Sequence, residues 1–167
     1  MKPELSVVIP VCNEELNVLP LAREVASALA GTSIEIIFID DGSTDGTAAA
    51  VRAARAEIPA IRMLQHARRS GQSAALCTGI RRSHGDWIAT LDGDGQNDPA
   101  DIPRLLAARE QEGLGAVRLF MGHRVTRRDT WLRRVSSRVA NGVRGWTRKD
   151  GTPDTGCGIK VFDRDVF

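Results

Sequence analysis

The sequence has few cysteines and no long apolar run, and each shortage excludes a class of protein. Its three cysteines, Cys12, Cys77 and Cys157, lie far apart and form no CxxC pair. This spacing indicates reduced thiols rather than a disulfide framework or a zinc site. No stretch approaches the roughly 18 to 20 apolar residues that a membrane-spanning helix needs. The chain is therefore predicted to be cytoplasmic, with no transmembrane segment of its own.

An excess of charge of either sign is also missing. The 23 Lys and Arg residues nearly balance the 21 Asp and Glu residues, for a net charge of +2. This balance argues against a nucleic-acid binder and against an acidic solvating tail. The three histidines, His66, His84 and His123, lack metal-ligand spacing and are interpreted as surface or packing residues.

The length and composition are typical of one globular domain. A chain of 167 residues with 42% hydrophobic and 26% charged residues can bury a core of its own. We therefore expect a single domain over residues 1–167. Because the chain stops at Phe167, just after the helix-start pattern Asp163-Arg164-Asp165, we also expect that it is a shortened form of a longer protein or that a partner completes the fold.

Apolar strands alternate with helical segments along the chain. Residues 5–11 (LSVVIPV) and 34–39 (IEIIFI) are continuous apolar runs, as in parallel strands that are covered on both faces. A helix is predicted after the first run, with Asn17 as N-cap and Pro20 in the first turn. The alternation is predicted to continue as helix 47–57, strand 61–64, helix 71–82, strand 87–91, a helix from Asp98-Pro99 to 112, and strands 117–121 and 159–162. This order predicts an α/β fold with a mostly parallel central sheet and helices on both faces.

Three of the predicted strands end in polar loops. These loops contain Asn13-Glu14, Asp40-Asp41-Gly42-Ser43 and Asp92-Gly93-Asp94-Gly95-Gln96. In open parallel sheets, ligands bind beyond the carboxyl ends of the strands. The convergence of three polar loops at one edge is the main clue to function.

The acidic loop carries two carboxylates and an amide at alternate positions, Asp92, Asp94 and Gln96. Such hard oxygen ligands suit Mg²⁺ or Mn²⁺. An ion held by one or two carboxylates completes its shell with water and substrate phosphates, so a diphosphate is the expected companion ligand. Taken alone, the loop is equally well a solvated acidic turn.

Three other phosphate- or metal-binding motifs fit the sequence less well than a metal and diphosphate site does. Counted from Asp92, the sixth and twelfth loop positions are Asn97 and Pro103, whereas an EF-hand needs Gly and Glu there. An aspartyl-phosphatase would use Asp92 as a nucleophile, but that family places the motif on its first strand, whereas here other βα units precede it. This phosphatase reading stays open as a minor alternative. The first strand is not followed by the GxGxxG of a dinucleotide site.

The loop of Asp40 and Asp41 has two interpretations. Asp, Gly and Ser are common in a helix-starting turn, which needs no ligand. A carboxylate beyond the turn, such as that of Asp41, is also able to accept a hydrogen bond from an N–H group of a nucleobase. Glu14 is similarly placed to accept from a base or a ribose.

Together these motifs resemble the ordered signatures of glycosyltransferase family 2. The resemblance rests on residues 8–14 (VIPVCNE), 39–45 (IDDGSTD) and 91–96 (LDGDGQ), and it extends from Leu5 to about Phe162. It implies the GT-A fold, a Rossmann-like sandwich. Asp98-Pro99 after the acidic loop, followed by residues 122–124 (GHR), is similar to the branch of dolichol-phosphate mannosyltransferases and polyprenyl-phosphate glycosyltransferases.

The resemblance also implies roles for individual residues. It implies that the base and ribose are surrounded by Pro10, Cys12, Glu14, Ile39 and Asp41. It implies that the metal and diphosphate are held by Asp92, Asp94 and Gln96, with Gly93 packed beneath the sugar nucleotide. The catalytic residues it implies are Asp94, Arg124 at the phosphates or sugar, and Arg133 or Arg134 at the acceptor phosphate, although these last two equally fit a solvated basic face. Cys12 stands where the family often has tyrosine, and His123 where it usually has a small residue.

These expectations combine into one predicted reaction. The resemblance implies an inverting transfer of a hexose from a nucleoside-diphosphate sugar, assisted by Mg²⁺ or Mn²⁺, to a polyprenyl phosphate at the inner face of the membrane. No QxxRW motif follows Arg124, and a phosphate acceptor needs no catalytic base because it is already anionic. The alternative is a remnant that binds the donor without transferring it. The sequence leaves the sugar, the nucleotide, the acceptor length and the oligomeric state open.

Overall fold

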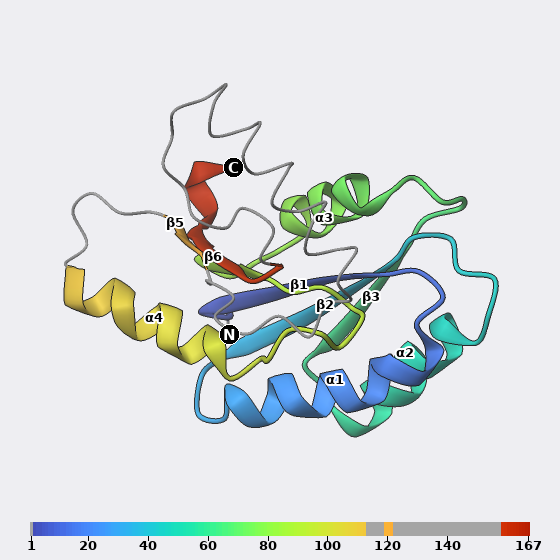
Figure 1. Cartoon of the computed structure of the whole chain (residues 1–167), viewed down its shortest axis with the longest axis horizontal. Helices are drawn as coiled ribbons and strands as arrows, with labels where there is room; N and C mark the ends of the chain where they lie inside the picture. The colour runs from blue at the N-terminus through green and yellow to red at the C-terminus, as the bar shows by residue number, and fades with distance from the viewer. Residues whose placement is uncertain (1, 113–118, 122–157) are drawn as a thin grey trace, which may run out of the picture. The chain divides into compact units, whose positions relative to one another are not determined.

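The computed structural model describes residues 2–112, 119–121 and 158–167 of the chain. All of them belong to one compact unit formed by residues 1–121 and 158–167, so the expectation of a single domain over the whole chain stays a prediction. The unit is built around one sheet (Figure 1). Its strands are β1 (Leu5–Val11), β2 (Ile34–Asp40), β3 (Ile61–Gln65), β4 (Trp87–Thr90), β5 (Leu119–Met121) and β6 (Lys160–Asp163). Its helices are α1 (Glu15–Ala28), α2 (Thr47–Glu57), α3 (Gln72–Arg81), α4 (Asp101–Glu112) and the short 3₁₀ helix η1 (Arg164–Val166).

The sheet is mostly parallel, with the strand order β3-β2-β1-β4-β6-β5. Strands β1 to β4 run parallel to their neighbours, whereas β6 is antiparallel to both β4 and β5. The chain moves outward from β1 through β2 to β3, and then returns to place β4 on the other side of β1. The predicted α/β class and mostly parallel sheet are confirmed.

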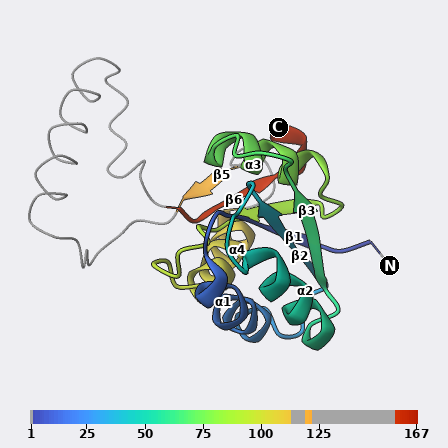
Figure 2. The same ribbon diagram turned by 90° about the vertical axis from the view of Figure 1, so that its right-hand side faces the viewer.

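Helices cover both faces of the sheet, as predicted. Helices α1, α2 and α4 lie on one face and α3 lies on the other (Figures 1 and 2). Every residue of β1 is buried, and so is every residue of β2 after Ile34. Under α3, Ile39 packs in a core cluster with Val8 and Ala75. The continuous apolar runs therefore mark strands that are covered on both faces.

Two predicted helix starts are wrong by a few residues. Helix α1 begins at Glu15, not after an Asn17 cap, so Pro20 lies inside the helix rather than in its first turn. The reason is that the backbone N–H of Glu14 donates to Thr47 Oγ1 at 2.8 Å, at the start of α2. Helix α4 begins at Asp101, and the predicted cap Asp98 instead forms a preceding turn in which its side chain accepts from the N–H of Ala100. Of the strand predicted over 117–121, residues 117 and 118 lie outside the described residues.

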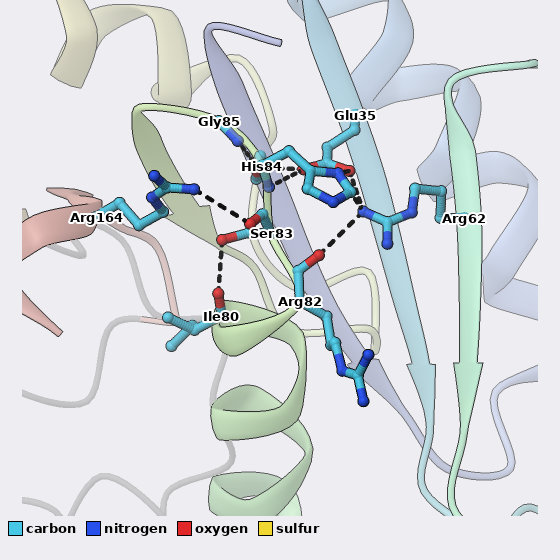
Figure 3. A network of polar contacts seen from close by, with 9 residues as sticks. Glu35, Arg62, Ile80, Arg82, Ser83, His84, Gly85 and Arg164 are labelled. Carbon is cyan, nitrogen blue, oxygen red and sulfur yellow. Dashed lines mark hydrogen bonds and ion pairs between the residues drawn. The ribbon is translucent and has the colours of Figure 1, made fainter. Parts of the chain in front are cut away.

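A buried polar network joins strands at the edge of the sheet opposite to their carboxyl ends (Figure 3). Glu35, near the start of β2, is only 6% exposed. Its carboxylate accepts from Ser6 Oγ at 2.7 Å, from the N–H of His84 at 2.5 Å and from Arg62 Nη1. Burial alone would raise the pKa of Glu35, but the bonds from Ser6, His84 and Arg62 outweigh it and hold the pKa below its ordinary value of 4.5. The network ties the loop before β4 to the starts of β1, β2 and β3.

Candidate functional site

The three polar loops singled out in the sequence follow adjacent strands. Strand β1 pairs with β2 on one side and with β4 on the other, all in parallel. Their loops therefore leave the same edge of the sheet, and those after β1 and β2 turn at the right-hand end in Figure 1. The strand order reverses between β1 and β4, which is the kind of position where open α/β sheets bind ligands. The convergence predicted from the sequence is confirmed.

The loop after β1 is bonded to the loop after β2. Asn13 adopts a left-handed backbone conformation with φ of 59°. Its N–H donates to Ser43 Oγ at 3.0 Å, and its side-chain oxygen accepts from the N–H of Thr44 at 2.8 Å. Glu14 follows, and its carboxylate accepts from Asn17 Nδ2 at 2.6 Å. The two loops thus form one hydrogen-bonded rim, on which Glu14 and Cys12 are half-buried.

Asp41 is fixed by three protein hydrogen bonds. It is 3% exposed, and it accepts from His66 Nδ1 at 2.7 Å and from the N–H groups of Ser70 and Gly71 at 2.9 and 2.7 Å. His66 also contacts Thr78 through Nε2 at 2.9 Å. Burial alone would raise the pKa of Asp41, but the bonds from His66, Ser70 and Gly71 outweigh it, so the pKa lies below its ordinary value of 3.8. Asp41 anchors the loop after β3 to the end of β2.

Because the pKa of Asp41 is lowered in the folded protein, the contribution of Asp41 to the free energy of unfolding should depend on pH. A carboxylate whose pKa is lower in the folded state stabilises the fold above its ordinary value of 3.8, and this contribution is lost as the pH falls through the lower folded value. The free energy of unfolding of Asp41→Asn should therefore differ most from wild type at neutral pH. The difference should shrink as the pH falls below 3.8, because Asp41 is protonated first in the unfolded chain and, below its lower folded pKa, in the folded protein as well. Urea unfolding at a series of pH values measures it, and a difference that grows on acidification would contradict this account.

The acidic loop lies directly against the end of β1. A Cβ atom on Gly93 would come within 2.6 Å of both the carbonyl oxygen of Pro10 and Val11 Cγ1. Only glycine permits this close approach, because real Cβ atoms essentially never lie so near to backbone oxygen. Gly93 therefore packs on β1. Its predicted place beneath the sugar nucleotide stays a prediction.

The two carboxylates of the acidic loop have different surroundings. Asp92 is half-buried, and its oxygens accept from Gln72 Nε2 at 2.7 Å and from Asn97 Nδ2 at 3.3 Å. Asp94 is exposed, and its Oδ1 accepts from the N–H of Gln96, whose side chain is also exposed, at 3.0 Å. Asp92 is thus fixed by neighbouring elements, whereas Asp94 extends toward solvent with most of its acceptor capacity free.

The donor set of this loop fits a divalent ion that is shared with a substrate. Within the described ranges, no three or more His, Cys, Asp or Glu side chains are grouped so that they could hold a metal ion by themselves. A Mg²⁺ or Mn²⁺ that is completed by water and a diphosphate needs only one or two carboxylates. Asp92, Asp94 and Gln96 supply oxygen ligands of that kind. Their assignment as metal ligands stays a prediction.

The other predicted site residues fall into two groups. Pro10 is buried in β1, and the Ile39 side chain lies in the core under α3, so contact of Ile39 with a nucleotide would be through its backbone. Arg124, Arg133 and Arg134 lie outside the described residues. The structure therefore places the residues predicted to bind the nucleotide sugar, which belong to β1, β2, β4 and their loops, at one edge of the sheet. The predicted arginines of the site stay untested.

Sequence reasoning missed three polar side chains that contact the site. Gln72 and Asn97 both donate to Asp92, and His66 donates to Asp41. Gln72 follows Gly71 at the start of a helix, which looks like an ordinary helix start. One signal was available in the sequence. Gln72 follows a predicted parallel strand, as the acidic residues of the site do, so its side-chain amide could have been placed at the same edge of the sheet.

Solved structures of GT-A glycosyltransferases share this fold. Glucosyl-3-phosphoglycerate synthase from Mycobacterium tuberculosis, in complex with Mn²⁺, UDP-glucose and glycerol 3-phosphate, superposes with a TM-score of 0.77 at 22% identity, covering 98% of this chain and 58% of that chain. A mannosyltransferase from Pyrobaculum calidifontis, in complex with GDP-mannose and Mn²⁺, gives a TM-score of 0.66 at 21% identity, covering 99% of this chain and 46% of that one. At these identities the likeness establishes the fold.

Comparison of the sequence with known proteins identifies the family of the chain. The family model "Glycosyl transferase family 2" matches residues 6–167, so the chain belongs to this family, as its motifs predicted. A curated relative, dodecaprenyl-phosphate galacturonate synthase from Rhizobium johnstonii, is 40% identical over 168 residues. The match covers 98% of this chain and 49% of the relative, so the chain spans about half the length of that protein.

Proposed function

We propose that this protein is an inverting glycosyltransferase that moves a hexose-type sugar from a nucleoside-diphosphate donor to a polyprenyl phosphate, with a divalent cation. The observation that carries the proposal is the loop of Asp92 and Asp94, which is docked on β1 where the loops of three parallel strands meet. In a chain of glycosyl transferase family 2, this loop is best suited to bind the diphosphate of the donor.

The rim formed by the loops after β1 and β2 is proposed to hold the base and ribose. Glu14 and Cys12 are half-buried there, so their side chains are accessible to a ligand. Asp41 already accepts three hydrogen bonds from the protein, and a carboxylate has about four acceptor positions. One N–H of a base would therefore complete Asp41, which is consistent with its proposed role at the base.

The proposed chemistry is a single displacement. An oxygen of the acceptor phosphate forms a bond to the anomeric carbon while the bond to the diphosphate breaks, and the nucleoside diphosphate leaves with the electron pair. The transition state resembles an oxocarbenium ion, and the configuration inverts. When bound, a divalent ion supplies Lewis-acid neutralisation of the departing diphosphate. Asp94 would orient that ion, and the acceptor oxygen, which is already ionised, needs no catalytic base.

The proposed acceptor follows from the curated relative. The name of that relative specifies dodecaprenyl phosphate and galacturonate, so these are the first acceptor and sugar to test for this chain. We place the reaction at the inner face of the membrane, where a polyprenyl phosphate and a cytoplasmic nucleotide sugar meet. Across the part of the chain that the structure describes, no helix has the length and apolarity required to cross a bilayer.

A two-step experiment tests the proposal. A thermal-shift screen of UDP-, GDP- and dTDP-sugars with Mn²⁺ should identify one nucleotide that stabilises the protein. A ligand at 100 times its Kd adds about 2.7 kcal/mol, which corresponds to a rise in Tm of roughly 5–10 °C for a domain of this size. The selected labelled donor is then incubated with dodecaprenyl phosphate. Label in the lipid fraction supports the proposal, whereas binding without transfer would support a donor-binding remnant.

A further inference from the structure

The side chain of Gln72 is joined to the acidic loop by one directed hydrogen bond. Gln72 is the first residue of α3, and its Nε2 lies 2.7 Å from Asp92 Oδ1. Because an ionised carboxylate only accepts hydrogen bonds, the amide of Gln72 must present its NH₂ group to Asp92. The side chain of Gln72 is otherwise exposed, so it is not needed to fill the core.

Asp92 is restrained from other directions as well. Asn97, which is 8% exposed, donates to the second carboxylate oxygen at 3.3 Å. The backbone of Gly158, just before β6, lies so close that a Cβ atom there would be 2.1 Å from Asp92 Oδ2. Thr90 holds that backbone through a bond from its hydroxyl to the carbonyl of Gly158 at 3.2 Å. Gln72 is the exposed member of this group, so it is the one that can be changed with least effect on packing.

We propose that Gln72 is a positioning residue of the donor site, which fixes the orientation of the Asp92 carboxylate toward the metal and diphosphate. The inference rests on the proposed function. Each carboxylate oxygen of Asp92 accepts one hydrogen bond from an amide, which uses one of the two lone pairs of that oxygen. The other lone pair is left for the metal and the nucleotide sugar. Groups that orient a ligand in this way commonly change metal affinity by about 10- to 100-fold when they are removed.

A purely structural role for Gln72 makes the opposite prediction for Gln72→Glu. Glutamate has nearly the same size, and a negative charge at the start of a helix is favourable. If Gln72 only starts α3, the substitution should therefore leave both Tm and ligand binding intact. If Gln72 positions Asp92, the new carboxylate cannot donate and repels Asp92, so binding weakens although Tm is maintained.

The experiment measures Tm and, by calorimetry, the Mn²⁺-dependent affinity of the protein for the one of UDP, GDP and dTDP that wild type binds best. We expect Gln72→Glu and Gln72→Ala to weaken the affinity by about 10-fold or more, with Tm of the Glu variant unchanged or raised. Gln65→Glu is the matched control, because Gln65 Nε2 donates to Asp40 Oδ2 at 2.9 Å, another amide–carboxylate bond at the end of a strand. Asp40 is fully buried, and its other oxygen accepts from the N–H of Ser43 in the rim at 2.9 Å. The control should therefore lower Tm and weaken the nucleotide affinity less than Gln72→Glu does.

The possible failures are distinguishable. If wild type binds one of these nucleotides with Mn²⁺ and Gln72→Glu binds it as tightly or more tightly, the positioning role is overturned while the proposed function stands. Equal losses of affinity in Gln72→Glu and Gln65→Glu would also overturn it, since the effect would then not be specific to Asp92. If wild type shows no Mn²⁺-dependent binding of UDP, GDP or dTDP, the proposed function fails, and this role of Gln72 fails with it.

Discussion

Replacing Asp94 with alanine should abolish metal-dependent donor binding and lower the rate of sugar transfer by about 100-fold or more, since a bound cation contributes several kcal/mol to stabilising the leaving group. Asp94 is the exposed carboxylate of the acidic loop, and the N–H of Gln96 is the one group that donates to it in the described part of the chain. Its removal should leave the free energy of unfolding within about 0.5 kcal/mol of wild type. The loss would therefore report on the ligand and not on the fold.

Asp98 provides a closely matched control for this substitution. Its side chain is also exposed, and it accepts from the N–H of Ala100 at 2.9 Å, two residues further on, just as Asp94 accepts from Gln96. Asp98→Ala should retain Mn²⁺-dependent binding of the donor in calorimetry. If Asp94→Ala bound the nucleotide with unchanged metal dependence, or if both variants lost binding equally, the assignment of Asp94 would be wrong.

Replacing Glu35 with alanine should produce the largest loss of stability, about 3 kcal/mol. The substitution removes an acceptor from Ser6, from the N–H of His84 and from the guanidinium of Arg62 at a buried position. Buried donors left without an acceptor cost about 1–3 kcal/mol each, and breaking a buried ion pair by deleting one partner costs about 3–5 kcal/mol. Because the Arg62 side chain is 34% exposed and can regain water, we expect the lower end of that range.

The matched control for Glu35 is Glu57, which forms an ion pair with Arg23 at distances of 2.6 and 2.7 Å. That pair is also a carboxylate with a guanidinium, but both side chains are about half exposed. Exposed ion pairs contribute little to stability, so Glu57→Ala should unfold at nearly the same urea concentration as wild type. A loss in Glu35→Ala no greater than in Glu57→Ala would contradict the importance of burial in the network of Figure 3.

Much of the fold was predictable because its strongest patterns are local. Residues 5–11 and 34–39 are apolar apart from Ser6 and Glu35, and these runs become the buried strands β1 and β2. The start of α1 was not predictable in the same way. Thr47 and Asp45, about thirty positions further along, accept from the first N–H groups of that helix and replace the expected cap by Asn17. A local pattern contains no information on such a contact.

In the candidate site, too, local features were predictable and contacts between distant parts of the chain were not. The acidic loop and its place beyond a parallel strand follow from the sequence, since the order of strands and the polar residues at their ends are local features. The partners of Asp92 come from α3, from the loop before α4 and from the segment before β6, and they meet only in the folded protein. Asp41 illustrates the limit further, because its bonds to His66, Ser70 and Gly71 come from the loop after β3, and no local pattern predicts where that loop lies in the fold.

The proposed metal and nucleotide site is tested most directly by a crystal structure of the protein with Mn²⁺ and the nucleoside diphosphate that the thermal-shift screen selects. Anomalous data would locate the metal. We expect one manganese peak between the diphosphate and the Asp94 carboxylate, at about 2 Å from a carboxylate oxygen. The base should lie on the rim formed by the loops after β1 and β2. A nucleotide bound at this edge without metal at residues 92–96, or a metal bound elsewhere, would contradict it.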